Sequence, residues 1–177
     1  DGIVTNQQAT DGSEWLLRTA PSGGGLYPVD LYCMVINVDG LAPGLYFYNV
    51  LHHSLEQLIA RDFTAVLRTA TALEETVDRA GVCILMAGFM QRAKFKYGER
   101  AYRFALLEAG HIAQNVLLAT QAEGLGGYPI GGFLDDDLNL ALGLNGCDEI
   151  VLYLVLLGHC QSGKGQSTLN TFKSPRS

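Results

Sequence analysis

The stretch ERAYRFALLEAGHIAQNVLLATQAE, residues 99–123, decides the fold because it has no proline, one glycine, and apolar residues at helical spacing. Gly124 follows and is placed to end the helix. Leu107 and Leu118 lie off the main apolar stripe, and a helix that is apolar on several faces is buried on several sides. We therefore expect this helix at the centre of the fold or in a subunit interface. Its small residues would allow close packing there: Ala105, Ala109 and Ala113.

Shorter elements surround this helix in the sequence. Runs rich in apolar, β-branched and aromatic residues indicate strands, and the run at 82–89 is typical of a central strand covered on both faces. The expected strands are 31–38, 44–50, 54–59, 82–89, a short one within 124–133, and 149–157, with helices at 63–73 and 135–144. The aspartates at 135–137 would cap the second of these helices. The pattern predicts one α+β domain over residues 1–177.

Composition argues against several classes of function. With 48% hydrophobic and 17% charged residues, the chain has surplus apolar surface that suits a partner subunit. No apolar run reaches the roughly 20 residues that span a bilayer, so no membrane segment is expected. The formal net charge of −6 argues against nucleic-acid binding, which needs a basic patch. The cysteines lack zinc or redox spacing and residues 1–13 do not resemble a signal peptide, which favours a reducing cytoplasm.

A glycine-rich loop, PSGGGLYP at 21–28, is the first candidate site. Consecutive glycines permit positive φ and let backbone amides approach a ligand closely, while Pro21 and Pro28 stiffen the two ends. On these residues alone, the loop could be any tight turn that binds an anion or a cofactor.

A second glycine-rich segment, GLGGYPIGGF at 124–133, superficially resembles a dinucleotide-binding fingerprint. It follows a helix rather than a strand, and Pro129 stands where the third glycine is needed, so we reject a Rossmann interpretation. We interpret it as a short strand that ends in a turn at Gly131 and Gly132, whose backbone approaches something planar.

Lys96 and Tyr97 are the candidates for proton transfer. They lie in KFKYG, residues 94–98, between an apolar strand and the long helix. A desolvated lysine can lose or hold a proton, and a tyrosine can donate or accept one, so the pair suits proton abstraction beside a carbon that yields hydride. The alternative is a solvated basic turn before a helix.

Two further pairs have weaker chemical interpretations. Glu108 and His111 have the Glu-x-x-His spacing of a carboxylate-bridged metal site, but the sequence has no second such pair. A structural or surface role is therefore expected for them, and no metal. His159 and Cys160 could form a Cys-His pair, but no third residue to orient them is identifiable, so a nucleophilic role is not expected.

Four blocks together resemble the SagB-type dehydrogenases of the nitroreductase-like flavoprotein superfamily: PSGGGLYP at 21–28, KYGERAYR at 96–103, EAGHIAQN at 108–115 and IGGF at 130–133. They occur in order, and the resemblance runs from about Arg18 to Gly158. It implies a nitroreductase-like fold, with a central, mostly antiparallel sheet flanked by helices, in a homodimer. It also implies an FMN enzyme that oxidises peptide thiazolines or oxazolines to thiazoles or oxazoles, beside a cyclodehydratase or within a nonribosomal peptide synthetase.

The resemblance also implies which residues form the site. Lys96 and Tyr97 fall on the pair associated with catalysis in the family. The family segment Arg-Arg-Ser-x-Arg, which contacts FMN phosphate and ribityl, has no counterpart in residues 1–15. The residues implied to contact FMN are Ser22, Gly23 and Gly24 in the first loop, Gly131 and Gly132 in the second turn, and Lys173 and Arg176 near the end of the sequence.

Two other functions remain open on the sequence. One is an NAD(P)H-dependent nitro- or quinone reductase on the same fold, which the pair Lys96 and Tyr97 disfavours because a simple reductase needs no dedicated base. The other is a flavin-free partner domain, which the missing arginine-rich segment favours.

Overall fold

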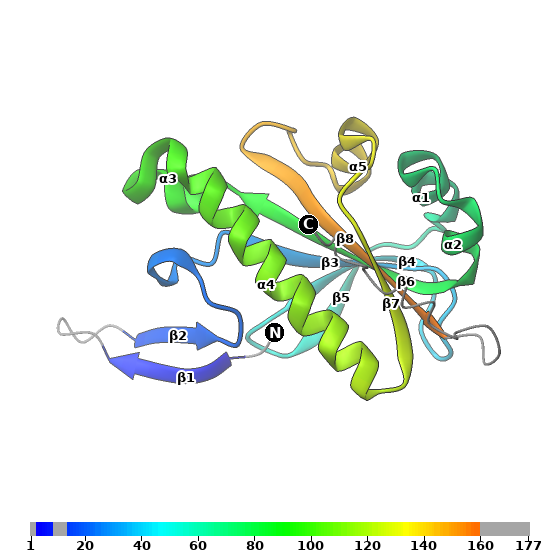
Figure 1. Ribbon diagram of the computed structural model, residues 1–177, viewed down its shortest axis with the longest axis horizontal. Helices are drawn as coiled ribbons and strands as arrows, with labels where there is room; N and C mark the ends of the chain where they lie inside the picture. The colour runs from blue at the N-terminus through cyan, green and yellow to red at the C-terminus, as the bar shows by residue number, and fades with distance from the viewer. Residues whose placement is uncertain (1–2, 9–13, 160–177) are drawn as a thin grey trace, which may run out of the picture.

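The computed structural model describes residues 3–8 and 14–159 of the chain. Its main feature is a six-stranded sheet in the order β5-β4-β3-β6-β8-β7, with every neighbouring pair antiparallel (Figure 1). Near the N-terminus, β1 (Ile3–Gln8) and β2 (Glu14–Arg18) form a separate antiparallel pair. The strands of the main sheet are β3 (Val29–Val35), β4 (Gly44–Asn49), β5 (Ser54–Ile59), β6 (Ala80–Phe89), β7 (Leu125–Ile130) and β8 (Glu149–His159).

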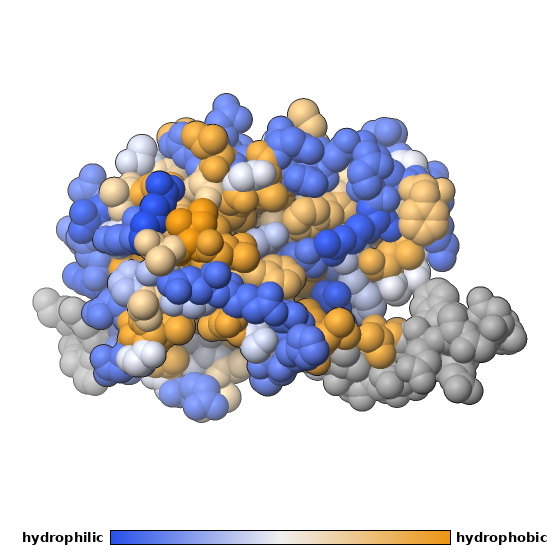
Figure 2. All heavy atoms as spheres, turned by 180° about the vertical axis from the view of Figure 1, so that it is seen from behind, coloured by the Kyte–Doolittle hydropathy of each residue, from blue (hydrophilic) through white to orange (hydrophobic). Residues whose placement is uncertain are grey.

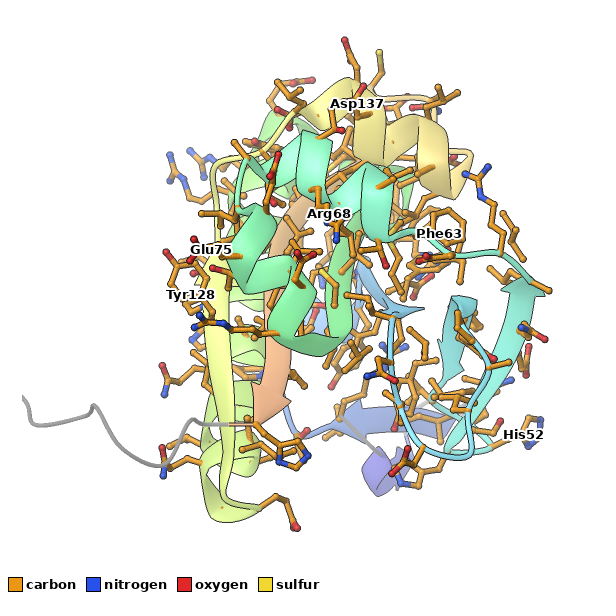
Figure 3. The ribbon with its side chains drawn as sticks, turned by 90° about the vertical axis from the view of Figure 1, so that its right-hand side faces the viewer. His52, Phe63, Arg68, Glu75, Tyr128 and Asp137 are labelled. Carbon is orange, nitrogen blue, oxygen red and sulfur yellow. The ribbon has the colours of Figure 1, made fainter. Side chains whose placement is uncertain are left out.

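Helices cover both faces of this sheet. Successive residues of β6 alternate between two hydrophobic cores, as the pleat requires. Leu85 packs with Leu67 and Leu138 on one face, whereas Met86 packs with Ile112 on the other. Figure 3 shows the helices that carry Arg68 and Asp137 on the same side of the sheet. The first face is covered by α1 (Thr64–Thr71), α2 (Glu74–Arg79) and α5 (Asp135–Leu142), and the second by α4 (Ala101–Ala122).

The long helix α4 confirms the central prediction from the sequence, but its burial differs. Ala105, Ala109 and Ala113 pack against the sheet, whereas Leu107 and Leu118 are 54% and 61% exposed. The sheet covers one side of α4, so burial at the centre of the fold is wrong for these two leucines, whereas burial in a subunit interface stays a prediction.

Most predicted strands are confirmed with small shifts of their ends, but two helices were missed. The helix expected at 63–73 ends at Thr71, because Ala72 adopts a left-handed backbone with φ of 55°, and α2 follows as a separate helix. Residues 91–97 form the other missed helix. The predicted aspartate cap of α5 is wrong, since Leu134 occupies the cap position and makes no side-chain cap hydrogen bond. The aspartates lie instead in the first turn, near the positive end of the helix.

Large hydrophobic side chains also remain on the surface. Seen from behind, hydrophobic side chains form several groups that hydrophilic ones separate (Figure 2). Among the described residues, Leu140 and Phe95 are the most exposed large hydrophobic side chains, at 81% and 77%. In residues 3–8 and 14–159, no helix has both the length and the apolar character needed to cross a membrane.

Candidate functional site

Lys96 and Tyr97 lie at the end of the helix α3 (Gln91–Tyr97), which connects β6 to the region of α4. Residues 91–97 are helical rather than a turn, but Lys96 is exposed, so the solvated character of the alternative that the sequence left open at 94–98 is present. Alanine and lysine are good helix formers, which explains why these residues continue as a helix. The helix ends at Gly98, whose φ of 54° few other residues adopt without strain.

Two ion pairs fix α3 to the sheet. Arg92 donates two hydrogen bonds of 2.7 Å to the two carboxylate oxygens of Asp30 in β3. Lys94 Nζ lies 2.6 Å from Oδ1 of Asp148, which precedes β8, and this hydrogen bond lowers the pKa of the Asp148 carboxyl. Bidentate arginine–carboxylate pairs have defined geometry, so the pair at Asp30 fixes the orientation of α3 as well as its position.

The predicted glycine loop folds as a short 3-10 turn, η1 (Gly23–Gly25), just before β3. Its second and third glycines have φ of 65° and 64°, a left-handed backbone that explains the need for glycine there. Ser22 Oγ accepts a hydrogen bond from the backbone N–H of Tyr27 at 2.9 Å. The Tyr27 hydroxyl in turn accepts one from the backbone N–H of Arg18 at 2.8 Å. These two hydrogen bonds connect Tyr27, near the end of the loop, to Ser22 at its start and to Arg18 before it.

The structure brings this loop together with Lys96 and Tyr97. A Cβ atom on Gly24 would lie 2.5 Å from the Tyr97 hydroxyl oxygen and 2.8 Å from Lys96 Nζ. A Cβ atom on Gly23 would lie 3.0 Å from the ring of Phe104, and that ring lies 4.5 Å from the Tyr97 ring between centroids. Only backbone without side chains fits beneath the amine and the phenol. Two parts of the sequence that were singled out separately therefore form one cluster.

Glu108 lies at the other side of this loop and is buried, at 1% exposure. Its Oε1 accepts a hydrogen bond of 3.3 Å from the backbone N–H of Val29, the first residue after the loop region. Burial raises the pKa of the Glu108 carboxyl, while the Ser22 hydroxyl and the Val29 amide act in the opposite direction. His111 is exposed, so the two side chains do not converge on one metal position. In the described part of the chain, no three or more His, Cys, Asp or Glu side chains are grouped to hold a metal ion.

Gly131 and Gly132 directly follow β7, as the sequence predicts for a strand that ends in a turn. A Cβ atom on Gly131 would contact the Tyr153 ring at 3.5 Å, whereas one on Gly132 would meet nothing within 4 Å. Figure 1 shows β7 running from the end of α4 towards α5. The atoms within 4 Å of these two Cβ positions include none from the η1 loop, Lys96 or Tyr97.

Three of the residues singled out in the sequence lie outside the described residues: Lys173, Arg176 and Cys160. His159 is described, and it is an exposed residue at the end of β8.

The cluster suits proton transfer beside a flat ligand. It combines the primary amine of Lys96, which is exposed, with the phenol of Tyr97, and both lie over the partly exposed backbone of Gly24. The positions beside the α-carbons of Gly23 and Gly24 are filled by Phe104, Tyr97 and Lys96, so a planar ring would lie beside this cluster rather than on the glycine carbons. The amine and the phenol can exchange protons with such a ring, and in this respect the residues fit a flavin.

Several residues that shape the site were missed in the sequence. Arg92 and Asp30 are 62 positions apart, and no local pattern marks them as a pair. Phe104 lies beside the buried stripe of α4 and gave no separate signal. Glu108 had a signal, because it falls at the spacing i+3 from Ala105, on the helix face that the core covers.

Comparisons with known proteins agree with this architecture. The profile of the Nitroreductase family matches residues 7–159. A solved structure of a candidate nitroreductase from Anabaena variabilis aligns with a TM-score of 0.83 and 29% identity, over 88% of this chain and 32% of that chain. The trifolitoxin-processing protein TfxB of Rhizobium leguminosarum bv. trifolii is 31% identical over 69% of this chain and 34% of TfxB.

A third relative is the microcin B17-processing protein McbC of Escherichia coli, which is 28% identical over 67% of this chain and 45% of McbC. The solved structure of the E. coli microcin synthetase McbBCD complex with truncated pro-MccB17 bound aligns with a TM-score of 0.72 and 25% identity, over 81% of this chain and 56% of that chain. This chain thus spans about a third to a half of the length of TfxB and McbC.

The predicted nitroreductase-like α+β fold is confirmed by these alignments, with its antiparallel sheet and long helix. Proteins of this fold are oxidoreductases that typically bind flavin. The match of one family profile to nearly the whole described region, together with the aligned structures, shows that the chain belongs to the nitroreductase family.

Proposed function

We propose that this chain forms part of an FMN-dependent dehydrogenase that oxidises thiazoline or oxazoline rings in peptides to thiazoles or oxazoles. The observation that carries the proposal is the placement of Lys96 Nζ and the Tyr97 hydroxyl over the α-carbon of Gly24. TfxB and McbC support a peptide substrate, because both are peptide-processing proteins by name. The McbBCD complex, a microcin synthetase, supports a protein partner for this chain. We propose that this partner is either a cyclodehydratase or a peptide synthetase.

The reaction defines what the side chains must do. Converting an azoline to an aromatic azole removes two hydrogens from neighbouring ring carbons, one as a hydride and one as a proton. FMN, when bound, accepts hydride. Lys96 or Tyr97 takes the proton, since both reach the same point above Gly24 and either group can act as a base.

Holding FMN is assigned to backbone and charge. The backbone of the two glycine-rich turns is proposed to lie against the ring, and two late cations are proposed to supply charge for the phosphate. The residues proposed to contact FMN are Ser22, Gly23, Gly24, Gly131, Gly132, Lys173 and Arg176.

A second copy of the chain is proposed to complete the site. Lys96 is exposed, and Phe95 beside it is 77% exposed, so the cluster lacks a cover within the described part of one chain. Leu107 and Leu118 are eleven positions apart, which is three helical turns, so they lie on the same outward face of α4. Stable homodimers bury upwards of about 2,000 Å² around an apolar centre. Leu107 and Leu118 would contribute apolar surface to such an interface, beside the exposed polar residues His111 and Gln114 on the same face.

Changing Leu107 and Leu118 together to aspartate should convert the protein to a monomer and abolish stable FMN binding. Charges at these positions would have to be buried in the interface, at high cost. Sedimentation velocity and flavin absorbance of the purified variant measure the two effects. Leu140→Asp is the matched control, because Leu140 is 81% exposed on α5, on the opposite face of the sheet. A flavin-loaded monomer of the unchanged protein would refute the interface.

One spectrum separates the proposed activity from its alternatives. The protein should purify with noncovalent FMN, keep its flavin oxidised when NADH is added, and lose flavin absorbance when an azoline peptide is added without oxygen. Bleaching by NADH would favour a nitro- or quinone reductase, which the similarity to the candidate nitroreductase from Anabaena variabilis makes the second choice. Failure to bind FMN even from excess cofactor would favour a flavin-free partner domain.

A further inference from the structure

Two arginines line a cavity of about 250 Å³ beside the glycine loop. Arg18 is the last residue of β2, and Arg92 lies in the first turn of α3. Figure 1 shows these two elements and the loop on the same side of the molecule. Two cations in an otherwise apolar wall suit an anionic group that is attached to an apolar one. The rest of the wall is aliphatic or aromatic: Leu16, Leu26, Tyr27, Val50 and Leu51.

The Arg18 side chain is held in place by an aromatic ring. Its guanidinium carbon lies 4.6 Å from the centre of the Tyr27 ring, which is the range of a cation–π contact. Tyr27 is fixed in turn, because its hydroxyl accepts a hydrogen bond from the Arg18 backbone and its own backbone N–H donates to Ser22. In residues 3–8 and 14–159, no carboxylate forms an ion pair with Arg18. The contact with the ring leaves the N–H groups at the edge of the guanidinium able to bind a planar anion.

Arg92 carries a second guanidinium, whose charge Asp30 already balances. Its terminal nitrogens donate two hydrogen bonds of 2.7 Å to Asp30 and one of 3.4 Å to the backbone oxygen of Tyr27. Because a guanidinium has five N–H donors, these three contacts leave two donors for a ligand. With Asp30 included, the two arginines contribute a net charge of about +1 to this region. A carboxylate matches that charge, whereas a phosphate monoester carries about −1.5 to −2 at pH 7.

The cavity lies next to the cluster that is proposed to transfer the proton. Arg92 and Lys96 are four positions apart on α3, so they are neighbours on one face of the helix, with about 5–6 Å between their Cβ atoms. Leu26 in the cavity wall follows Gly24, which lies against Lys96, by two positions. An extended peptide advances about 3.3–3.6 Å per residue, so one or two residues separate a group in the cavity from a ring beside Lys96.

The size of the cavity limits what it can hold. Pockets for whole small-molecule ligands have volumes of about 300–1,000 Å³, so this cavity fits only one end of a ligand. We propose that it binds a carboxyl group of the peptide substrate, with the apolar side chain next to it, and thereby selects the ring that reaches Lys96. Arg18 is the main binding residue, and Arg92 is the second. That the carboxyl group belongs to a peptide rests on the proposed function.

The first experiment measures binding without flavin or turnover. N-acetyl-leucine has a carboxylate and an apolar side chain, and N-acetyl-leucinamide is its neutral counterpart. Both are titrated into the purified protein and followed by ligand-observed NMR. We expect the acid to bind about tenfold or more tightly than the amide, because hydrogen bonds to charged groups are stronger than neutral ones. Arg18→Gln should remove this preference, and equal binding of acid and amide by the unchanged protein would overturn the proposal.

Arg61→Gln is the matched control for this variant. The Arg61 guanidinium carbon lies 4.4 Å from the centre of the Phe63 ring, and no carboxylate in the described ranges pairs with Arg61 either. Phe63 belongs to the core beneath α1 and α5, and Arg61 does not line the cavity. The control deletes the same charge from the same kind of contact, so it should keep the preference for the acid. Equal losses in the two variants would show an effect of net charge and count against the site.

The second experiment separates a carboxylate ligand from the phosphate of the cofactor. It compares the Kd for FMN with the Kd for riboflavin, which lacks the phosphate, from quenching of flavin fluorescence. We expect Arg18→Gln to change either Kd by about twofold at most. Weaker binding of FMN with unchanged binding of riboflavin would assign the arginines to the phosphate and overturn the proposal.

The third experiment tests the link to the substrate. With an azoline peptide that ends in a carboxylate, Arg18→Gln should raise KM by about tenfold and keep kcat, whereas an amidated peptide should show no difference. The same KM change for both peptides would refute the role in substrate binding. No azoline oxidation by the unchanged protein would refute the proposed function instead, and the titration with acid and amide would still judge the cavity.

Discussion

Lys96→Ala should lower the rate of azoline oxidation by about 100-fold or more and leave FMN bound, in line with the loss of a general acid or base. Lys96 Nζ lies over Gly24 and 5.4 Å from the centre of the Tyr97 ring, so its removal takes a proton acceptor from the cluster. Its side chain is exposed and supports no packing in the core, so the fold should be unaffected. Anaerobic single-turnover bleaching of flavin by an azoline peptide measures the step directly.

Lys94→Ala is the matched control for this change. Lys94 lies on the same helix, two positions earlier, and its amine pairs with Asp148 rather than with the loop. Removing it deletes the same charge and one attachment of α3, and exposed ion pairs of this kind contribute little to stability. We expect a change of a few-fold at most in the single-turnover rate. Equal losses in the two variants would show that Lys96 acts through the net charge of α3, and unchanged turnover in Lys96→Ala would remove it from the chemistry.

Tyr97→Phe tests the other half of the pair. The phenol oxygen lies closest to the position of a Cβ on Gly24, and the ring packs on Phe104. Phenylalanine keeps this packing and deletes only the hydroxyl. If the rate falls less than in Lys96→Ala, the lysine is the main base; if it falls more, the phenol is.

Local patterns predicted most of the fold. The strand at 54–59 has the predicted bounds, and the long helix differs from its prediction by two residues at the start and one at the end. The long helix has an apolar spacing that a single sequence window can show. By contrast, α2 and α3 are six and seven residues long, too short for a hydrophobic period to stand out.

The candidate site was predictable in its parts but not in its assembly. Gly24 and Lys96 could be singled out because each lies in a stretch with unusual chemistry for its place in the chain. Their contact depends on α3, whose position is set by Arg92 and Asp30. Such a pair joins residues that are distant in the sequence. It can be recognised only once the register of the strands in the sheet is known.

The burial of Glu108 shows a different limit. The helical period placed it on the buried face, yet a glutamate on a buried face conflicts with its usual exposure. The Glu-x-x-His spacing, without a second such pair in the sequence, predicts a structural or surface role for this residue and no metal. The backbone N–H of Val29, which donates a hydrogen bond to Glu108, carries no signature in the sequence at all.

Gly24→Ala should impair the site as severely as the loss of Lys96, by about 100-fold in azoline oxidation, although it adds a single methyl group. The added Cβ would lie 2.5 Å from the Tyr97 hydroxyl oxygen and 2.8 Å from Lys96 Nζ. Both atoms are ends of flexible side chains, so they can move away and the chain can still fold. The amine and the phenol would then leave the position that the reaction requires.

Gly40→Ala separates this displacement from backbone strain. Gly40 also has a left-handed backbone, with φ of 79°, but a Cβ there would meet nothing within 4 Å. Both variants therefore incur the strain of a non-glycine residue at positive φ, about 1–2 kcal/mol, and should melt at similarly reduced temperatures. Only Gly24→Ala should lose turnover and weaken FMN binding. If both variants kept full activity, or both lost it equally, the close contact between the loop and Lys96 would not be what organises this site.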